Sequence, residues 1–317
     1  MNRRSIIVVG SANTDLVIRV PRLPRPGETV TGGEFRIVAG GKGANQAVAA
    51  SRAGARVAFI ACIGRDHFGD AAVAGLRREK INTRYVVRDR RTPSGVALIM
   101  VDARGENLIS VARGSNDALL PRHVDAALPA IRSARCLLVQ LEIPLATVRR
   151  AVELAARHHV PVVLNPAPAQ PVPLALLRQA TFLTPNEHEL RALTGLSATS
   201  RSGIEAAAAK LRAAGVAHVL VTCGSRGICW CGADGICWFP APKVKAIDTV
   251  GAGDCFSGAF AVAFAEDRSM SDAIDFAVAA AAISVTRPGA QSSMSSRREI
   301  LRALVSSGRR FRSKTRL

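Results

Sequence analysis

Short apolar runs alternate with longer segments of helical periodicity along most of the chain. The runs that we predict to be buried strands cover residues 6–9, 57–61, 136–140, 162–164, 181–183 and 219–222. The segments with the alanine, leucine and valine spacing of helices packed on a sheet cover residues 43–53, 145–158, 204–214 and 272–286. This alternation predicts an α/β protein with a three-layer, Rossmann-like arrangement, in which helices cover a mainly parallel sheet.

Two segments interrupt the alternation of strands and helices. Residues 15–38 and 92–111 alternate apolar and polar positions and contain proline and glycine. That pattern is typical of strands with one solvated face, so we predict that both segments form a small second sheet inserted into the main unit. We expect one domain over residues 1–300, followed by a tail over residues 301–317. The basic residues that we interpret as a solvated end of this tail are Arg309, Arg310, Arg312, Lys314 and Arg316.

Hydropathy and cysteine content indicate in which cellular compartment the protein is expected. No stretch of about 18 apolar residues is present that could span a bilayer, and the apolar run after the basic Arg3 and Arg4 is too short for an export signal. Seven cysteines, an odd number, indicate free thiols in a reducing compartment, so we expect a cytoplasmic protein. The crowded Cys223, Cys229, Cys231 and Cys237 lack the spacing of zinc ligands, and we interpret them as small strand residues.

The formal net charge of +19 raises the alternative of a nucleic-acid partner. The arginines are scattered through the whole chain, however, and aromatic residues make up only 4% of it. A single-strand binder needs aromatic side chains among its basic ones, on which bases stack. The composition therefore argues against nucleic acid as the partner.

The segment most specific for chemistry is a turn of small residues that leads into an apolar helix, at 248–260. Gly251, Ala252 and Gly253 leave backbone N–H groups open to an anion, and the start of a helix adds a favourable dipole. Asp254 would lie in the first helical turn beside that anion, where it could take a proton from a hydroxyl group. The alternative from local physics is an acidic residue that only stabilises the start of a helix.

A second glycine-rich segment, residues 40–47, opens another helix and carries polar side chains. It lacks the spacing of a phosphate-binding P-loop, so Lys42 is not assigned the role of the P-loop lysine. Asn45 beside bare backbone suits a polyhydroxylated ligand, although the glycines could equally cap a helix. Asn13 and Asp15 follow the first strand, where open α/β sheets bind their ligands, and an Asn/Asp turn is the competing interpretation.

These segments together resemble the PfkB-type carbohydrate kinase family, over about residues 5–300. The resemblance is carried by Gly-Ser-Ala-Asn-Thr-Asp at 10–15, Pro-Gly-Glu-Thr at 26–29, Gly-Gly-Lys-Gly-Ala-Asn-Gln-Ala at 40–47, Asn-Pro-Ala-Pro at 165–168, Thr-Pro-Asn-Glu at 184–187 and Asp-Thr-Val-Gly-Ala-Gly-Asp at 248–254. The segments at 40–47 and 165–168 favour the ribokinase group within that family. The resemblance implies a ribokinase-like fold, in which the small sheet is a lid over the sugar and often pairs with its copy in a homodimer.

The resemblance also implies roles for individual residues. Asp254 matches the catalytic base, and Gly251, Ala252 and Gly253 match the anion-binding turn. The positions that match the sugar site are Asn13, Thr14, Asp15, Gly41, Lys42, Gly43, Ala44, Asn45, Glu142 and Asp254. The positions that match the ATP site are Asn186, Thr222, Cys223, Gly224, Ser225, Arg226, Gly227 and Gly253.

Two cations are implied in the same way. Asn186 and Glu189 match a segment linked to Mg²⁺ through water. The positions that match a K⁺ site, mostly through backbone carbonyls, are Asp248, Val250, Ser284, Arg287, Gly289 and Ser293. The sequence departs from the family pattern at Val278, where relatives often have a polar residue near the adenine, and at Cys223, where an aliphatic residue is usual.

The expected activity is therefore transfer of the ATP γ-phosphoryl group to O5 of D-ribose, with ATP, Mg²⁺ and K⁺ as cofactors. A kinase for deoxyribose, a fructose-like ketose or a nucleoside remains the alternative within the class. From other classes, a sugar-sensing protein without turnover and a nucleic-acid-binding relative remain open. The second of these is expected to have lost its chemical residues, whereas Asp254 and the polar sugar set are present.

Overall fold

A computed structural model of the chain describes residues 5–306, and the basic residues of the predicted tail lie outside this range. The main sheet has nine strands in the order β13-β12-β11-β10-β9-β8-β1-β4-β5. All neighbouring strands are parallel except at β12 and β13, which add an antiparallel hairpin to one edge. The bounds are β1 Ser5–Val9, β4 Arg56–Gly64, β5 Val86–Asp89, β8 Cys136–Val139, β9 Val162–Leu164, β10 Phe182–Leu183, β11 Val219–Thr222, β12 Ile228–Gly232 and β13 Gly235–Phe239.

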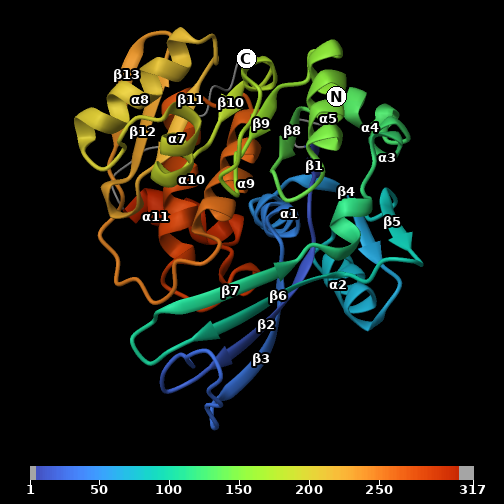
Figure 1. Cartoon of the computed structure of the whole chain (residues 1–317). Coiled ribbons are helices and arrows are strands. Elements are labelled where there is room, and N and C mark those ends of the chain that lie inside the picture. Colours follow the sequence, from blue (N-terminus) through green and yellow to red (C-terminus); the bar gives the residue numbers. More distant parts are fainter. Residues whose placement is uncertain (1–4, 307–317) are drawn as a thin grey trace.

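Helices cover both faces of this sheet, as the sequence predicts (Figure 1). On one face lie α1 Lys42–Arg52, α2 His67–Arg78, α9 Ala252–Ala265, α10 Met270–Ser284 and α11 Arg297–Ser306. The other face packs against α3 Pro121–Asp125, α4 Leu128–Ser133, α5 Leu145–Arg157, α6 Leu174–Leu177, α7 Glu187–Thr194 and α8 Arg201–Ala213. Alternate residues of the buried strands supply the two cores, since successive side chains point to opposite faces. The three-layer prediction is confirmed.

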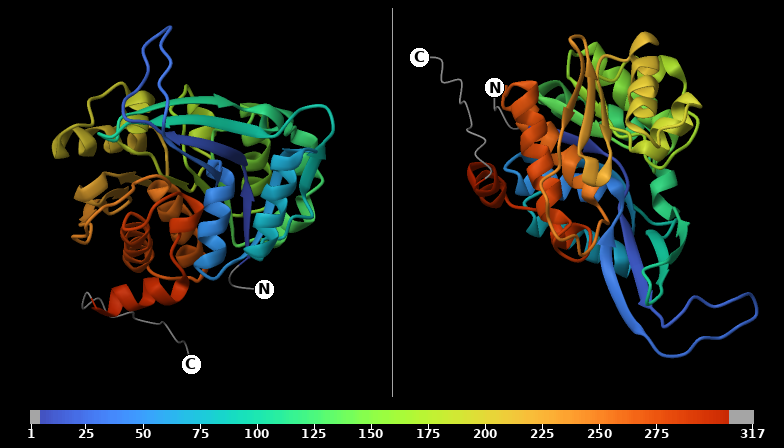
Figure 2. Two further views of the ribbon diagram at one scale, coloured as in Figure 1. Left: turned by 90° about the horizontal axis from the view of Figure 1, so that it is seen from below. Right: turned by 90° about the vertical axis from the view of Figure 1, so that its left-hand side faces the viewer.

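The two segments that interrupt the pattern form a separate four-stranded sheet. Its order is β3-β2-β6-β7, with β2 Asn13–Arg19, β3 Glu34–Gly40, β6 Gly95–Val101 and β7 Asn107–Ala112. Strands β2 and β6 are parallel, and the outer pairs are antiparallel. Figures 1 and 2 show this sheet projecting from one end of the main body, next to the start of α1. The predicted small sheet is confirmed, although residues 20–33 form a loop within it rather than strand.

Two boundaries differ from the expectation. The strand predicted at 181–183 is only two residues long in β10. The predicted tail boundary at residue 301 lies inside α11, which runs to Ser306. Ile300 and Leu304 of this helix are buried against the core, and this packing extends the folded domain beyond the end of the recognisable motifs.

The close approach of α1 to the loop after β1 depends on glycine. A Cβ atom on Gly43 would lie 2.5 Å from the backbone nitrogen of Ser11 and 2.6 Å from the carbonyl carbon of Gly10, inside van der Waals contact. The amide of Ala44 donates to the carbonyl of Ser11 at 2.8 Å across this contact. The start of α1 is thereby held at the carboxyl end of β1, between β8 and β4, where ligands bind in open α/β sheets. No helix among residues 5–306 is long and apolar enough to cross a membrane.

Candidate active site

Asp254 lies in the first turn of α9 and is buried, with 6% of its surface exposed. Both carboxylate oxygens accept hydrogen bonds from α1, which packs against α9. Asn45 Nδ2 donates to Oδ2 at 2.9 Å, and Gln46 Nε2 donates to Oδ1 at 2.9 Å. Burial raises the pKa of Asp254 above its ordinary value, while the charge of Lys42 and these two hydrogen bonds oppose the rise. The result is a buried acid with a fixed orientation.

The backbone around Asp254 exposes two amides at the helix start. Gly251 is the N-cap with a left-handed φ of 76°, and the amide of Cys255 already donates to its carbonyl at 2.8 Å. The amide of Ala252, predicted as part of the anion-binding turn, donates to the carbonyl of Thr249 at 3.2 Å and is not free. The amides of Gly253 and Asp254 have no hydrogen-bond acceptor within the described chain. A Cβ atom on Gly253 would meet nothing within 4 Å, so the space beside Gly253 is open. Free N–H groups at a helix N-terminus, facing open space, suit an anion.

Lys42 supplies a positive charge that acts on the Asp254 carboxylate. Burial by itself lowers the pKa of Lys42, but nearby carboxylates outweigh that effect and raise it above the ordinary value. Those carboxylates belong, in decreasing order of effect, to Asp254, Glu142, Glu189 and Asp15. The lysine thus lies among the acids of both the predicted sugar side and the predicted nucleotide side.

The predicted sugar residues gather at the junction of the main sheet with the small sheet. Glu142 Oε2 accepts from Ser11 Oγ at 2.5 Å and from the amide of Lys42 at 2.9 Å. Asp15 lies against the bare backbone of Gly40, where a Cβ would be 2.3 Å from its carboxylate. Burial first and the charge of Glu142 second raise the pKa of Asp15 to about 6.

Asn13 is fixed by a residue that carries no motif. Asn116 Nδ2 donates to Asn13 Oδ1 at 2.7 Å, and Asn116 Oδ1 accepts from the amide of Ala12 at 2.9 Å. Asn13 and Asp15 alternate with Thr14 along β2, so the side chain of Thr14 lies on the opposite face of the small sheet. The remaining predicted sugar residues, Gly41, Gly43 and Ala44, form the tight turn and first residues of α1.

One buried polar atom of the sugar side has no partner. Asn45 Oδ1 is buried, and no described residue donates to it. Because an unpaired buried acceptor costs free energy, it is a natural point for a ligand hydroxyl to donate a hydrogen bond. Amides and carboxylates converging in this way discriminate hydroxyl patterns.

The predicted nucleotide residues lie at the next strand ends. Asn186 caps α7 and Glu189 closes the capping box, with the Asn186 amide donating to Glu189 Oε2 at 2.8 Å and the Glu189 amide donating to Asn186 Oδ1 at 2.8 Å. Asn186 also pairs with Thr222, which brings α7 beside the short loop over residues 222–227 that contains η2 Gly224–Arg226. A carboxylate and an amide oxygen are suitable donors for a hydrated Mg²⁺, so this pair fits the ion in its donor chemistry.

The two departures from the family pattern are both buried. Cys223 is 3% exposed and its amide donates to the carbonyl of Gly227 within the loop. Val278 is 4% exposed in the core, while its neighbours Ala279 and Ala282 line an apolar pocket of about 260 Å³ between the chain at 240–244, α10 and α11. Arg226, the charged residue of the loop, is ion-paired with Glu187.

Among the predicted potassium residues, Val250 and Gly289 form a contact cluster with Asp248. Its Oδ1 accepts from the amide of Val250 at 2.9 Å and its Oδ2 from the amide of Gly289 at 2.8 Å. The hydroxyls of Ser284 and Ser293 donate to carbonyls three residues earlier in the chain. Backbone carbonyls and a carboxylate are hard oxygen donors, and the cluster therefore fits a hard cation.

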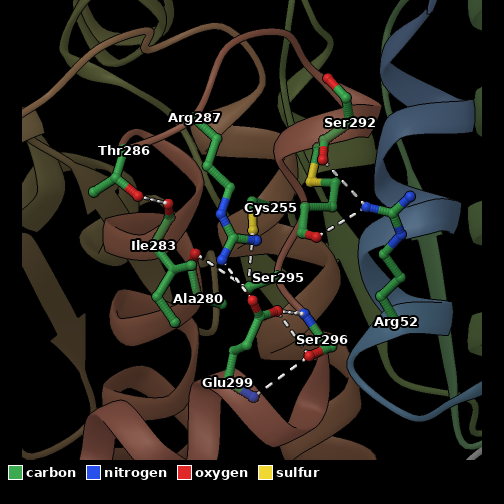
Figure 3. A network of polar contacts seen from close by, with 11 residues as sticks. Arg52, Cys255, Ala280, Ile283, Thr286, Arg287, Ser292, Ser295, Ser296 and Glu299 are labelled. Carbon is green, nitrogen blue, oxygen red and sulfur yellow. Dashed lines mark hydrogen bonds and ion pairs between the residues drawn. The ribbon is translucent and has the colours of Figure 1, made fainter.

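Arg287 has a structural contact instead of a side-chain role toward a cation. Figure 3 shows its guanidinium pointing at Glu299 of α11, with Nη2 to Oε1 at 2.5 Å. Glu299 Oε2 accepts from the amide and hydroxyl of Ser296 at 2.8 and 2.7 Å. This pairing ties the cation loop to the last described helix.

The structure brings together residues whose roles the sequence did not predict. Gln46 lies within a quoted motif but was given no role, and Gln140 was expected only as the end of a strand. Asn116 lies in η1 Gly114–Ala118. Only Gln46 carried a signal, because a polar residue among small helical residues beside a predicted site is unusual. The contacts of Asn116 and Gln140 are long-range and leave no local pattern.

Known proteins resemble this chain over nearly its whole length. The family model described as "pfkB family carbohydrate kinase" matches residues 3–297. The chain is 42% identical to a ribokinase of Haemophilus influenzae over 302 residues, 95% of this chain and 99% of the relative. It is 39% identical to a deoxyribokinase of Salmonella typhi over 289 residues, 91% of this chain and 94% of the relative. The solved structure of Arabidopsis thaliana ribokinase complexed with ribose and ATP superimposes with a TM-score of 0.90 at 34% identity, covering 95% of this chain and 98% of that one.

Proposed function

Because this chain belongs to the pfkB family of carbohydrate kinases, we propose that it transfers the γ-phosphoryl group of ATP to O5 of D-ribose. The observation that carries the proposal is the buried carboxylate of Asp254 beside the amides of Gly253 and Asp254, which have no partner among residues 5–306. A base and an anion site at one helix start are what phosphoryl transfer to a hydroxyl requires.

The chemistry follows from these positions. The O5–H bond breaks and its proton passes to the carboxylate of Asp254, while O5 forms a bond to the γ-phosphorus. The bond from that phosphorus to the bridging oxygen breaks, and ADP leaves. The amides of Gly253 and Asp254 stabilise the negative charge on the transferring group, and their positions are set before the reaction.

Other residues bind and orient the reactants. Asn13, Asp15, Glu142 and the free acceptor of Asn45 would receive sugar hydroxyls, and the loop 222–227 would lie along the nucleotide. Asn186 and Glu189 would hold Mg²⁺ through water, and Asp248 with backbone carbonyls would hold K⁺. The two ions supply positive charge that neutralises the phosphates and steadies the anion-binding turn.

The small sheet is proposed to act as a lid and a dimer contact. Asp15 and Asn13 on one of its faces border the sugar site, so closure would exclude water from the phosphoryl group. The opposite face exposes large apolar side chains, including Phe35 at 58%, Ile37 at 60% and Leu98 at 57%. A contiguous apolar face of this kind is expected to be covered by a partner surface, and we propose a second copy of the chain.

A second candidate substrate is 2-deoxy-D-ribose, because the deoxyribokinase relative is nearly as similar as the ribokinase. We place either reaction in the cytoplasm, where the seven cysteines, six of them buried, would remain thiols.

The test of the proposed function is ADP release with D-ribose, 2-deoxy-D-ribose, D-fructose and adenosine under equal conditions. The proposal requires the highest kcat/KM for D-ribose. A preference for another member of the panel would contradict the ribose assignment, and no turnover with any of them would contradict the kinase.

A further inference from the structure

The side chain of Gln46 lies at the centre of a buried group of polar residues, the polar centre, which consists of Gln46, Asp254, Asn165 and Gln140. It is fully buried in α1, and its side-chain nitrogen donates to two acceptors, Asp254 Oδ1 at 2.9 Å and Asn165 Oδ1 at 3.0 Å. Its side-chain oxygen accepts from Gln140 Nε2 at 2.5 Å. The amide group therefore joins the ends of strands β8 and β9 to the first turn of α9.

The direction of these hydrogen bonds is fixed by the backbone. Asn165 Nδ2 donates to the carbonyl oxygen of Thr184 at 2.8 Å, and a carbonyl oxygen can only accept. The side-chain oxygen of Asn165 must then face Gln46, so Gln46 has to present its nitrogen on that side. Because the same nitrogen also reaches Asp254, Gln46 is a donor toward the carboxylate whichever protonation state Asp254 has.

Asn45 lacks this constraint. Its nitrogen donates to the other carboxylate oxygen, but its own side-chain oxygen has no partner in the described chain. Rotation of the Asn45 amide by 180° would break its hydrogen bond to Asp254 Oδ2 and turn its oxygen toward that carboxylate, but it would disturb no third residue. Rotation of the Gln46 amide would place oxygen against two acceptors and nitrogen against the donor Gln140.

We propose that Gln46 is a positioning residue for the base, which holds the carboxylate of Asp254 in one orientation and leaves the oxygen lone pair toward the sugar as the place for the incoming proton. The inference rests on the proposed function of Asp254. A fixed donor favours the ionised carboxylate, because it stabilises the charged form against the desolvation that burial causes. The unfilled lone pairs are then the ones that face the open side of the site.

The alternative is a purely structural role, in which Gln46 satisfies buried polar groups between α1 and the sheet. Both roles predict a lower thermal midpoint when Gln46 is replaced. Only positioning predicts that the titration of Asp254 changes and that kcat falls while sugar binding is kept.

The experiment compares wild type with Gln46→Met, a near-isosteric change that removes the donor without adding charge. The carboxyl titration of Asp254 is followed by ¹³C NMR on aspartate-labelled protein, with the signal assigned by its loss in Asp254→Asn. We expect the pKa of Asp254 to rise by about one unit or more, the acidic limb of the kcat profile to move with it, and kcat to fall about 10- to 100-fold with the ribose KM within about threefold.

Thr147→Val is the matched control. Thr147 is fully buried and donates to the carbonyl of Leu119 at 2.5 Å, far from the polar centre in the other core. It should lower the thermal midpoint without moving the Asp254 titration. If Gln46→Met does not fold, Gln140→Met removes only the donor to the side-chain oxygen of Gln46 and should move the titration in the same direction by less.

A folded Gln46→Met protein with an unchanged Asp254 titration and an unchanged acidic limb would overturn the proposal. If wild type does not phosphorylate ribose, the proposed function fails separately, and the NMR titration still decides whether Gln46 controls Asp254.

Discussion

The side-chain nitrogen of Asn45 lies 2.9 Å from Oδ2 of Asp254, although 209 positions separate the two residues in the sequence. The contact joins the first turn of α9 to the first turns of α1, the two helix starts that carry the glycine-rich segments. Both segments therefore meet at one place, with the predicted base at their contact. Its replacement is the most direct test of the site.

Asp254→Asn should lower kcat by about 10² to 10⁴ while the affinities for sugar and ATP change far less. The new side-chain nitrogen can donate to Asn45 once the Asn45 amide rotates, so the fold should tolerate the change. Calorimetry with ribose, the thermal midpoint and coupled turnover measure the three effects. A stable variant with full activity would show that Asp254 only stabilises the start of the helix.

Gly253→Ala should separate activity from stability. The added methyl group meets no atom of the protein within 4 Å, and alanine is the better helix former, so the thermal midpoint should stay or rise. The methyl group would occupy the open space beside Gly253, where the transferring phosphoryl group is proposed to bind, so kcat/KM for ATP should fall at least about tenfold.

Gly251→Ala provides the contrast. Its φ of 76° is strained for alanine, and the new Cβ would lie 3.1 Å from that of Ala290, so this variant should lose stability by about 1 kcal/mol or more. Equal thermal midpoints for the two variants, or a fully active Gly253→Ala protein, would contradict this account of the turn.

Asp15→Asn should stabilise the protein without ligand and abolish tight sugar binding. The pKa of Asp15 is raised from 3.8 to about 6 by burial and by the charge of Glu142. Because the pKa of Asp15 is higher in the folded than in the unfolded protein, its contribution to stability is fully present below pH 3.8 and is lost as the pH rises through 6. At pH 7.5 the ionised Asp15 therefore lowers the free energy of unfolding. The thermal midpoint of the variant should exceed that of wild type at pH 7.5, with the difference shrinking toward pH 4. A difference independent of pH would exclude this cause.

Potassium should raise turnover above the rate in sodium at equal ionic strength, because a cation beside Asp248 would hold the anion-binding turn in place. Equal rates in potassium and sodium would show that no cation at this site supports turnover.

The ion pair of Arg287 with Glu299 allows a second test of the cation site. Glu299→Gln should raise the potassium concentration for half-maximal rate several-fold, whereas Glu205→Gln, which breaks an ion pair with Arg201 on α8, should leave it unchanged.

A charged side chain on the exposed apolar face of the small sheet should dissociate the proposed dimer into monomers. Ile37→Asp places a carboxylate on a side chain that is 60% exposed in the single chain, so the fold is retained while burial against a second copy becomes costly. Sedimentation should change from dimer to monomer. A wild-type protein that sediments as a monomer at micromolar concentration would refute the dimer itself.

The sequence by itself determined the three-layer α/β fold, because the period and the length of each apolar run are local properties that show whether a segment is a strand or a helix. Residues 162–164 and 219–222 were predicted to the residue as β9 and β11, and the segments without helical period were predicted as a second sheet. The motifs also located Asp254 and the turn before it, since a small-residue turn opening a helix has a local signature.

Tertiary structure decided which polar groups meet and in what direction they donate. Gln140 follows β8, Asn165 follows β9 and Gln46 lies in α1. Their hydrogen bonds acquire a direction only at the backbone carbonyl of Thr184. The end of the domain in α11 was likewise hidden, because a helix with two buried residues, Ile300 and Leu304, has too short an apolar pattern to be recognised. Local periodicity encodes which face of an element is buried, whereas contacts between distant elements arise only when the sheet brings their ends together.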